Sequence, residues 1–201
     1  MKQLYLFFAK VLLLALVLLT YAASDGLQRY EYRTHQMSIT GASNWQPWSL
    51  DVKEIGMRAD FKITDKGFIS LVGPVVLMVK TARISAPRPS MIDRNVVKAL
   101  KIIEHPYITF NLNQIDTRDL KYGVTLMKTI GQLTVAGTSQ EIEMDVYGRV
   151  LPNGEVEIWG SKGFNMEAFN IPPPAAFWGI IRSDPQVKVD FDIILRAVPK
   201  R

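Results

Sequence analysis

Residues 141–150 read EIEMDVYGRV, and apolar side chains recur there at every second position. Ile142, Met144, Val146 and Val150 share one parity, whereas Glu141, Glu143, Asp145 and Tyr147 take the other. Successive side chains of a β-strand point to opposite faces, so this pattern predicts a strand with one dry face and one wet face. Such one-sided strands are typical of antiparallel sheets.

The same period of two runs through most of the chain. Apolar and polar residues alternate in YITFNLNQI (107–115) and in QVKVDFDIIL (186–195). Turn-forming residues at 64–67 (TDKG), 152–154 (PNG) and 183–185 (SDP) separate such runs. We therefore expect about eight strands, near residues 30–40, 48–63, 67–83, 107–117, 122–137, 140–151, 154–166 and 186–197.

One segment has a helical period instead. In PSMIDRNVVKALKIIEHP (89–106), apolar residues recur every three or four positions, which predicts an amphipathic helix. Ser90 is the expected N-cap, Asp93 suits the first turn, and Pro106 ends the segment. One helix among eight strands indicates a single all-β domain with one helical insertion. Its strands hide their apolar faces either in a barrel or in a two-sheet sandwich, and the pattern alone leaves both open.

The first 24 residues have the pattern of a secretory signal peptide. Lys2 and Lys10 precede or flank an apolar run that extends to Leu19, and small residues follow at 22–24. Cleavage after Ala22 or after Ser24 fits this pattern, and the domain would then span residues 25–201. The alternative is a retained membrane anchor, since residues 4–23 are about long enough to cross a bilayer, although Lys10 lies within that span.

Composition and reactive side chains argue against several function classes. The chain has 24 Lys and Arg against 19 Asp and Glu, and without Lys2 and Lys10 the balance is 22 against 19, a net charge of +3. No basic run with interleaved aromatic residues is present, so we expect no nucleic-acid partner. The chain contains no cysteine, which excludes disulfides, thiolate metal sites and a cysteine nucleophile.

Catalytic and metal-binding groups are also scarce. His35 and His105 lie far apart in sequence, whereas a zinc site needs three or four ligands. No G-x-S-x-G nucleophile turn occurs, and the GTS at 137–139 is expected to be a turn between strands. Glu141, Glu143 and Asp145 are expected to form a solvated face. We therefore predict no catalytic residue, no metal site and no enzymatic cofactor.

Four blocks of sequence resemble a known family. They are MSITGASNWQPWSLDV (37–52), with its G-x-S-x-x-x-x-W stretch, MIDRNVVKALKIIEHPYITF (91–110), GQLTVAGTSQEIEMDV (131–146) and FNMEAFNIPPPAAFWGIIRSDPQVKVDFDIIL (164–195). In this order they resemble the YceI-like family of secreted lipid-binding proteins. The family often has a His-Asp pair before the tryptophan of the first block, where this chain has Gln46 and Pro47.

The resemblance implies an extended, eight-stranded, lipocalin-like antiparallel barrel that binds a polyisoprenoid lipid, such as a quinone or a polyprenyl chain, in the periplasm or outside the cell. After cleavage no stable membrane span is expected, and a homodimer remains open. The proline loop at 172–174 would be a rigid cover over an apolar tunnel. The residues expected to contact the ligand are Ile108, Phe110, Leu112, Leu133, Val135, Ile142, Met144, Val146, Met166, Phe169, Ile171, Phe177, Trp178, Ile180, Val189 and Phe191.

Two alternatives stay open beside the carrier. One is a structural or interaction barrel whose core is filled with side chains. The other is a hydrolytic enzyme on the same barrel, which would need polar side chains that converge inside, for instance His35 beside an acid.

Overall fold

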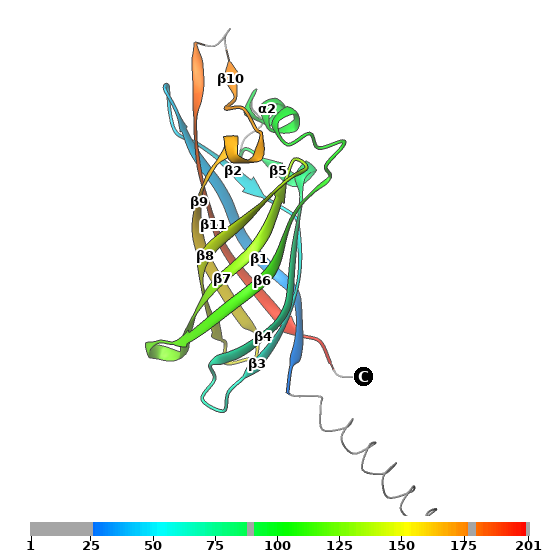
Figure 1. Ribbon diagram of the computed structural model, residues 1–201, viewed down its shortest axis with the longest axis vertical. Helices are drawn as coiled ribbons and strands as arrows, with labels where there is room; N and C mark the ends of the chain where they lie inside the picture. Colours follow the sequence, from blue (N-terminus) through cyan, green and yellow to red (C-terminus); the bar gives the residue numbers. More distant parts are fainter. Residues whose placement is uncertain (1–25, 88–90, 177–179, 200–201) are drawn as a thin grey trace, which may run out of the picture.

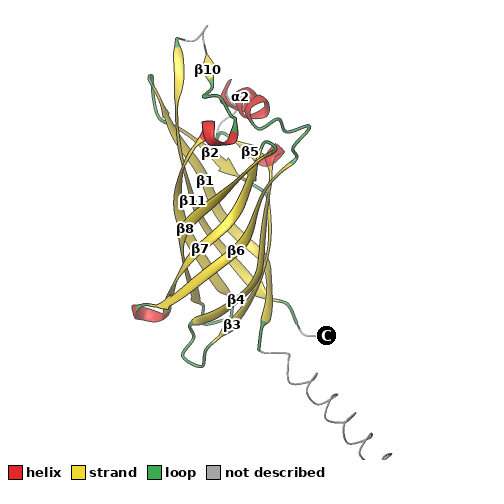
Figure 2. Cartoon of the chain, viewed as in Figure 1, coloured by secondary structure: helices red, strands yellow, loops and turns green. Residues whose placement is uncertain are grey.

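Eight long antiparallel strands close into a barrel in the computed structural model, which describes residues 26–87, 91–176 and 180–199 (Figures 1 and 2). These strands are β1 (Gln28–Ser43), β3 (Ile55–Ile63), β4 (Ile69–Lys80), β6 (Tyr107–Asp119), β7 (Val124–Val135), β8 (Thr138–Val150), β9 (Val156–Asn165) and β11 (Ile181–Ala197). Their order around the barrel is β11-β9-β8-β7-β6-β4-β3-β1, and β1 pairs with β11 to close it. The all-β prediction is therefore confirmed, and of the two open architectures the barrel is correct.

The expected strand over 48–63 is wrong in one respect, because it divides into two strands. The first, β2 (Trp48–Val52), pairs with Ser38–Gly41 of β1 and with the short β5 (Ile84–Ser85). The second, β3, pairs with the beginning of β1. At the junction, the Lys53 N–H donates to the Arg83 carbonyl over 2.9 Å, and the Glu54 carbonyl accepts from the Lys80 N–H over 3.2 Å. The chain thus changes its neighbours here without leaving these groups unbonded.

The helix is shorter than expected. The α-helix α2 spans Met91–Ala99, and the segment that follows is a series of turns. Lys101 has a φ of +47°, a left-handed conformation that a right-handed helix cannot continue through. The expected N-cap Ser90 lies outside the described residues, but the Asp93 carboxylate accepts a hydrogen bond from the Ala86 N–H over 2.8 Å. That bond ties α2 to the chain after β5, at the upper end of the barrel in Figure 2.

Other elements at the same end are short. They are the 3-10 turns η1 (Thr81–Arg83) and η3 (Met166–Phe169) and the two-residue strand β10 (Ala175–Ala176), whereas η2 (Lys121–Gly123) joins β6 to β7 at the opposite end. Within the described residues, no helix is both long and apolar enough to cross a membrane.

The expected turn between β7 and β8 is confirmed. Val135 pairs with Thr138, so only Ala136 and Gly137 form the loop, and both have positive φ, of +48° and +83°. This is the conformation of a tight hairpin turn that matches the twist of its strands. The ring of His105 lies over Gly137, where an added Cβ would be 2.6 Å from it, so the glycine also makes room for the histidine.

The lower end of the barrel is filled by side chains. Phe61, Ile69, Val156, Ile193 and Leu195 are all less than 3% exposed, and they come from the ends of strands that meet there. The Ile69 N–H, which begins β4, donates to the hydroxyl of buried Thr125 on β7 over 3.0 Å. These side chains therefore form a packed core at this end.

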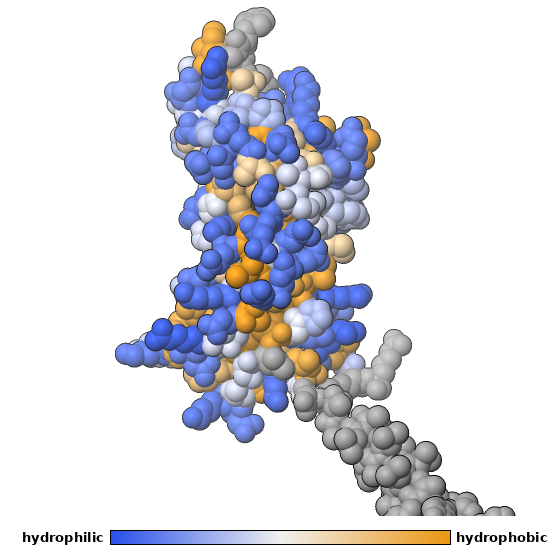
Figure 3. All heavy atoms as spheres, in the orientation of Figure 1, coloured by the Kyte–Doolittle hydropathy of each residue, from blue (hydrophilic) through white to orange (hydrophobic). Residues whose placement is uncertain are grey.

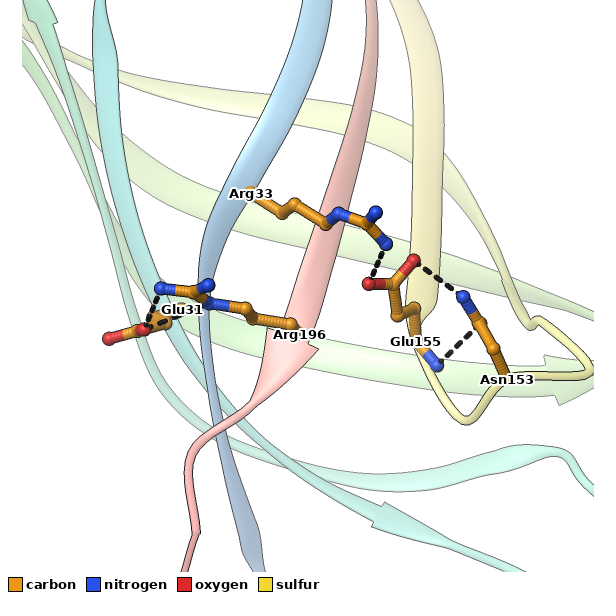
Figure 4. A network of polar contacts seen from close by, with 5 residues as sticks. All are labelled: Glu31, Arg33, Asn153, Glu155 and Arg196. Atoms are coloured by element: carbon orange, nitrogen blue, oxygen red, sulfur yellow. Dashed lines mark hydrogen bonds and ion pairs between the residues drawn. The ribbon is translucent and has the colours of Figure 1, made fainter.

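A polar network on the outer surface fastens the seam between β1 and β11 (Figure 4). Glu31 and Arg196 are cross-strand neighbours that form an ion pair at 2.9 Å. Arg33 reaches across to Glu155, which begins the approach to β9 and also accepts from the Asn153 side chain over 2.9 Å. The Arg33 hydrogen bond, followed by that of Asn153, lowers the pKa of Glu155 below its ordinary value.

One ladder of the barrel is only half formed. The pairing of β4 with β6 extends from Val76–Asn111 to Lys80–Tyr107 and includes no residue below Val76. Pro74 lies in the half of β4 that pairs with β3 but not with β6, and it has no N–H to give to a neighbouring strand. The surface in Figure 3 is mostly polar, with apolar residues gathered along its middle and lower part.

Candidate functional site

A cavity of about 250 Å³ lies in the upper half of the barrel. Its wall consists of the inward side chains of the strands, and α2, η3 and the chain before β10 cover part of it from above. Apart from Asn95, Lys162 and Ser183, every lining side chain is apolar. The alternation of each strand produces this wall, because the polar residues of the same strands face water.

A second cavity of about 80 Å³ lies directly below the first. Leu77, Phe110, Met144 and Phe191 line both, so these four side chains form the junction between them. An apolar cavity of about 150 Å³ is enough to bind benzene. Together, the two cavities therefore have room for a ligand that is considerably larger than one aromatic ring.

Two glycines set the width of this junction. A Cβ at Gly131 would be 2.4 Å from the ring of Phe110, and a Cβ at Gly160 would be 2.7 Å from the ring of Phe191. Gly160 is the cross-strand neighbour of Phe191. Each phenylalanine ring therefore occupies the space that a side chain would take at a glycine of the adjacent strand.

The segment that ends in the proline loop covers part of the upper cavity. Phe169 and Ile171 are each 5% exposed, and both line the cavity together with Pro174. The Asn165 side chain accepts from the Glu167 N–H over 2.9 Å and caps η3, and the Gln140 side chain donates to the Ala168 carbonyl over 2.8 Å. This cover is thus held by hydrogen bonds to β8 as well as by apolar contact.

Two expected members of the cover, Phe177 and Trp178, lie outside the described residues. A third, Ile180, was expected to face inward, and that expectation is wrong because its side chain is 72% exposed. It lies at the turn into β11, and the Asn44 side chain donates to its carbonyl over 2.8 Å. The turn is therefore bonded to the β1–β2 loop, and Ile180 does not line either cavity.

The remaining expected ligand contacts all face the inside of the barrel. Those that line the upper cavity are Ile108, Phe110, Leu133, Val135, Ile142, Met144, Met166, Phe169, Ile171, Val189 and Phe191. Leu112 and Val146 line the lower one. The structure thus brings these side chains together around an empty space, and their contact with a ligand stays a prediction.

Several lining residues were not expected. They are mainly on the first strands and the helix: Met37, Ile39, Trp48, Leu50, Val52, Val96 and Leu100. The alternation of Met37 with Ile39 and of Trp48 with Leu50 would have indicated the strand residues. The helix contributes because its apolar face covers the barrel mouth. The helical period predicts that face, but it does not indicate which part of the barrel the face covers.

The groups considered for catalysis have structural partners. His35 Nε2 lies 2.8 Å from the Val52 carbonyl, and Nδ1 lies 3.0 Å from the Tyr32 hydroxyl. Both ring nitrogens therefore bond to groups other than a carboxylate. The bond to Val52 links β1 to the last residue of β2, just before the chain continues into β3. Glu141, Glu143 and Asp145 are exposed, which confirms the solvated face.

A second cluster of polar and aromatic residues lies on the outside of β8, β9 and β11. The rings of Tyr147 and Trp159 stack with centroids 5.9 Å apart, and the guanidinium of Arg149 lies 5.5 Å from the centre of the Trp159 ring. Burial raises the pKa of Asp192, and the nearby Glu157 raises it further. These residues face away from both cavities.

Comparison with known proteins identifies the architecture. No family model and no curated protein matches the sequence. Among solved structures, BcnA of Burkholderia cenocepacia is 15% identical and aligns with a TM-score of 0.60 over 80% of this chain and 95% of its own. A polyisoprenoid binding domain from Saccharophagus degradans is 10% identical, with a TM-score of 0.63 over 86% of this chain and 99% of its own.

The YCEI protein of Campylobacter jejuni is also similar. It is 13% identical and has a TM-score of 0.57 over 75% of this chain and 85% of its own. All three comparisons cover most of both chains, so the likeness extends over the whole barrel. The protein therefore has the barrel fold of the YceI-like proteins, as its four sequence blocks indicated.

Proposed function

We propose that the protein is a non-catalytic carrier that holds the tail of an isoprenoid lipid, such as a quinone or a polyprenyl lipid, inside its barrel. The observation that carries the proposal is the upper cavity of about 250 Å³ with its almost wholly apolar wall. A barrel that served only as a scaffold would be more stable with that space filled, because each Å³ left empty costs about 24 cal/mol.

The physical basis of binding is burial. Each methylene group removed from water contributes about 0.8 kcal/mol, so even a short isoprenoid tail supplies several kcal/mol before the cost of ordering it. The flexible side chains of Met37, Met144 and Met166 line the cavity and can adapt to a branched tail. The Saccharophagus degradans domain, described as polyisoprenoid binding, has the same fold, which supports an isoprenoid as the first ligand to test.

The test has two parts. Mass spectrometry of lipids extracted from the natively purified protein should identify an isoprenoid. In parallel, Ile142→Trp fills the upper cavity, whereas Glu141→Trp places the same side chain on the wet face of the same strand. We expect Ile142→Trp to lose binding of an added isoprenoid and Glu141→Trp to keep it, with both variants folded. Full binding by Ile142→Trp, or no binding by the parent protein, would contradict the proposal.

We also propose that the protein is exported to the periplasm or beyond, as the leader pattern indicates. The leader lies outside the described residues. Amino-terminal sequencing of the exported protein should find a first residue between 23 and 25. An intact Met1 on membrane-bound protein would instead indicate a retained anchor.

A further inference from the structure

A single lysine interrupts the apolar wall of the barrel. On β9 the even-numbered residues face inward, as buried Val156 and Ile158 show. Lys162 has the same parity and therefore also faces the inside of the barrel. It pairs with Val189 of β11, another inward residue, and lines the upper cavity. In the described part of the chain, it is the only charged side chain that lines either cavity.

Lys162 also has no partner in the part of the chain that the structure describes, since no carboxylate lies within 4.0 Å of it and no hydrogen bond joins its side chain. Lys188, on the adjacent strand but on the outer face, instead pairs with Asp190 at 2.8 Å. A cation against an apolar wall is unfavourable unless a counter-charge or water compensates it. The wall of the upper cavity therefore includes one lysine for which the described residues supply no counter-charge.

The position of Lys162 along the strand suits a charged head group. The ladder between β8 and β9 extends upward only to the pair Val146–Gly160, so Lys162 lies just above the last pair of that ladder. Lys162 is only partly buried there. A head group bound there would keep some contact with water. Below it, the wall leads past Phe191 to the lower cavity, which is wholly apolar apart from the hydroxyl of Thr129.

We propose that Lys162 binds the acidic head group, a phosphate or a carboxylate, of a long-chain lipid whose tail extends toward the lower cavity. This inference rests on the proposed function and narrows it, because it selects an anionic amphiphile over a neutral quinone or a hydrocarbon. A hydrogen bond to a charged partner is one of the stronger polar interactions in proteins. The lysine would thus determine both the preferred ligand and its orientation in the barrel.

The experiment measures binding of farnesyl phosphate, farnesol and a fatty acid of similar length to four proteins. They are the parent, Lys162→Met, Lys162→Arg and the matched control Lys188→Met, which removes a lysine from the outer face. We expect the parent and Lys188→Met to bind the phosphate or the fatty acid about 10- to 100-fold more tightly than farnesol. Lys162→Met should keep the affinity for farnesol and lose this preference, and Lys162→Arg should retain it.

The outcomes separate the inference from the proposed function. If the parent binds none of the three ligands, the carrier function itself is wrong. If the parent binds all three alike, or if Lys162→Met keeps the preference for the acid, tail binding stands and the role of Lys162 is wrong. A preference for the phosphate over the fatty acid identifies a phosphorylated lipid as the ligand class, and the reverse identifies a carboxylic acid. Unfolding curves of each variant establish that the barrel remains folded.

Discussion

Replacing Gly160 with alanine tests whether the two cavities accept one continuous ligand. The new Cβ would lie 2.7 Å from the ring of Phe191, whereas carbon atoms prefer a separation of about 3.5–4.0 Å. The ring must therefore move by about 1 Å, and we expect it to move into the junction between the cavities, which Phe191 lines. We expect the variant to fold with a loss of about 1–3 kcal/mol in stability, the usual cost of overpacking.

The effect on binding should depend on ligand length. Filling the lower cavity of about 80 Å³ at about 24 cal/mol per Å³ is worth about 2 kcal/mol, or about 25-fold in Kd. A longer isoprenoid alcohol such as geranylgeraniol should lose about this much affinity in Gly160→Ala, because its tail no longer passes the junction. A shorter one such as geraniol should lose little, since it fits within the upper cavity.

The assay is a titration of both alcohols against the parent, Gly160→Ala and Gly163→Ala. Gly163 is an exposed residue of the same strand whose Cβ would meet nothing nearer than 4.0 Å, so it controls for the change from glycine to alanine. Equal losses for the two alcohols in Gly160→Ala would refute the idea of a continuous channel. Unchanged affinity for both would show that the ring of Phe191 moves elsewhere.

Three further predictions concern stability. Arg33 lowers the pKa of Glu155, so the ionised carboxylate stabilises the folded protein above the ordinary glutamate pKa, and this stabilisation is lost as the pH falls through the lowered value. Glu155→Gln should therefore lower the free energy of unfolding at neutral pH. Urea unfolding should show that the difference from the parent vanishes in acid. Burial raises the pKa of Asp192, so ionisation of this carboxyl opposes folding as the pH rises. Asp192→Asn should therefore be more stable than the parent at neutral pH. A difference in stability that persists in strong acid would show that ionisation of Asp192 is not its cause. Thr125→Val removes the acceptor of the buried Ile69 N–H and should cost about 1–3 kcal/mol, whereas an unchanged urea midpoint would mean that another group replaces the hydroxyl.

The alternation of side chains was enough to predict the strands and their inward faces. Residues such as Ile142 and Phe191 have the parity that the structure confirms, because a strand leaves each side chain only two directions. The division of the expected strand at 48–63 also had a signal. The apolar residues are even-numbered up to Val52 and odd-numbered from Ile55, which is the change of face that a new strand produces.

The cavities could not be predicted in the same way. Whether an inward Ile142 touches a core neighbour or faces an empty space depends on the side chains of seven other strands, most of which are far away in sequence. Gly131 and Gly160 illustrate this, since a glycine weakens its own strand but here makes room for a phenylalanine of the next strand. Lys162 was not among the expected lining residues, although it shares the parity of Val156 and Ile158, and that parity would have indicated an inward position.

The closure of the barrel has a consequence for how the chain can reach this state. The first strand pairs with the last one from Tyr30–Ala197 to Ser43–Ser183, so the seam joins the two ends of the described chain. Bringing such distant segments together costs loop-closure entropy before any contact compensates it, and folds rich in long-range contacts form slowly. During synthesis β2 and β3 can pair with one edge of β1, but its other edge has no partner until β11 has been made, and until then that edge is open to other chains. The nascent chain is thus exposed to aggregation until β11 has been synthesised.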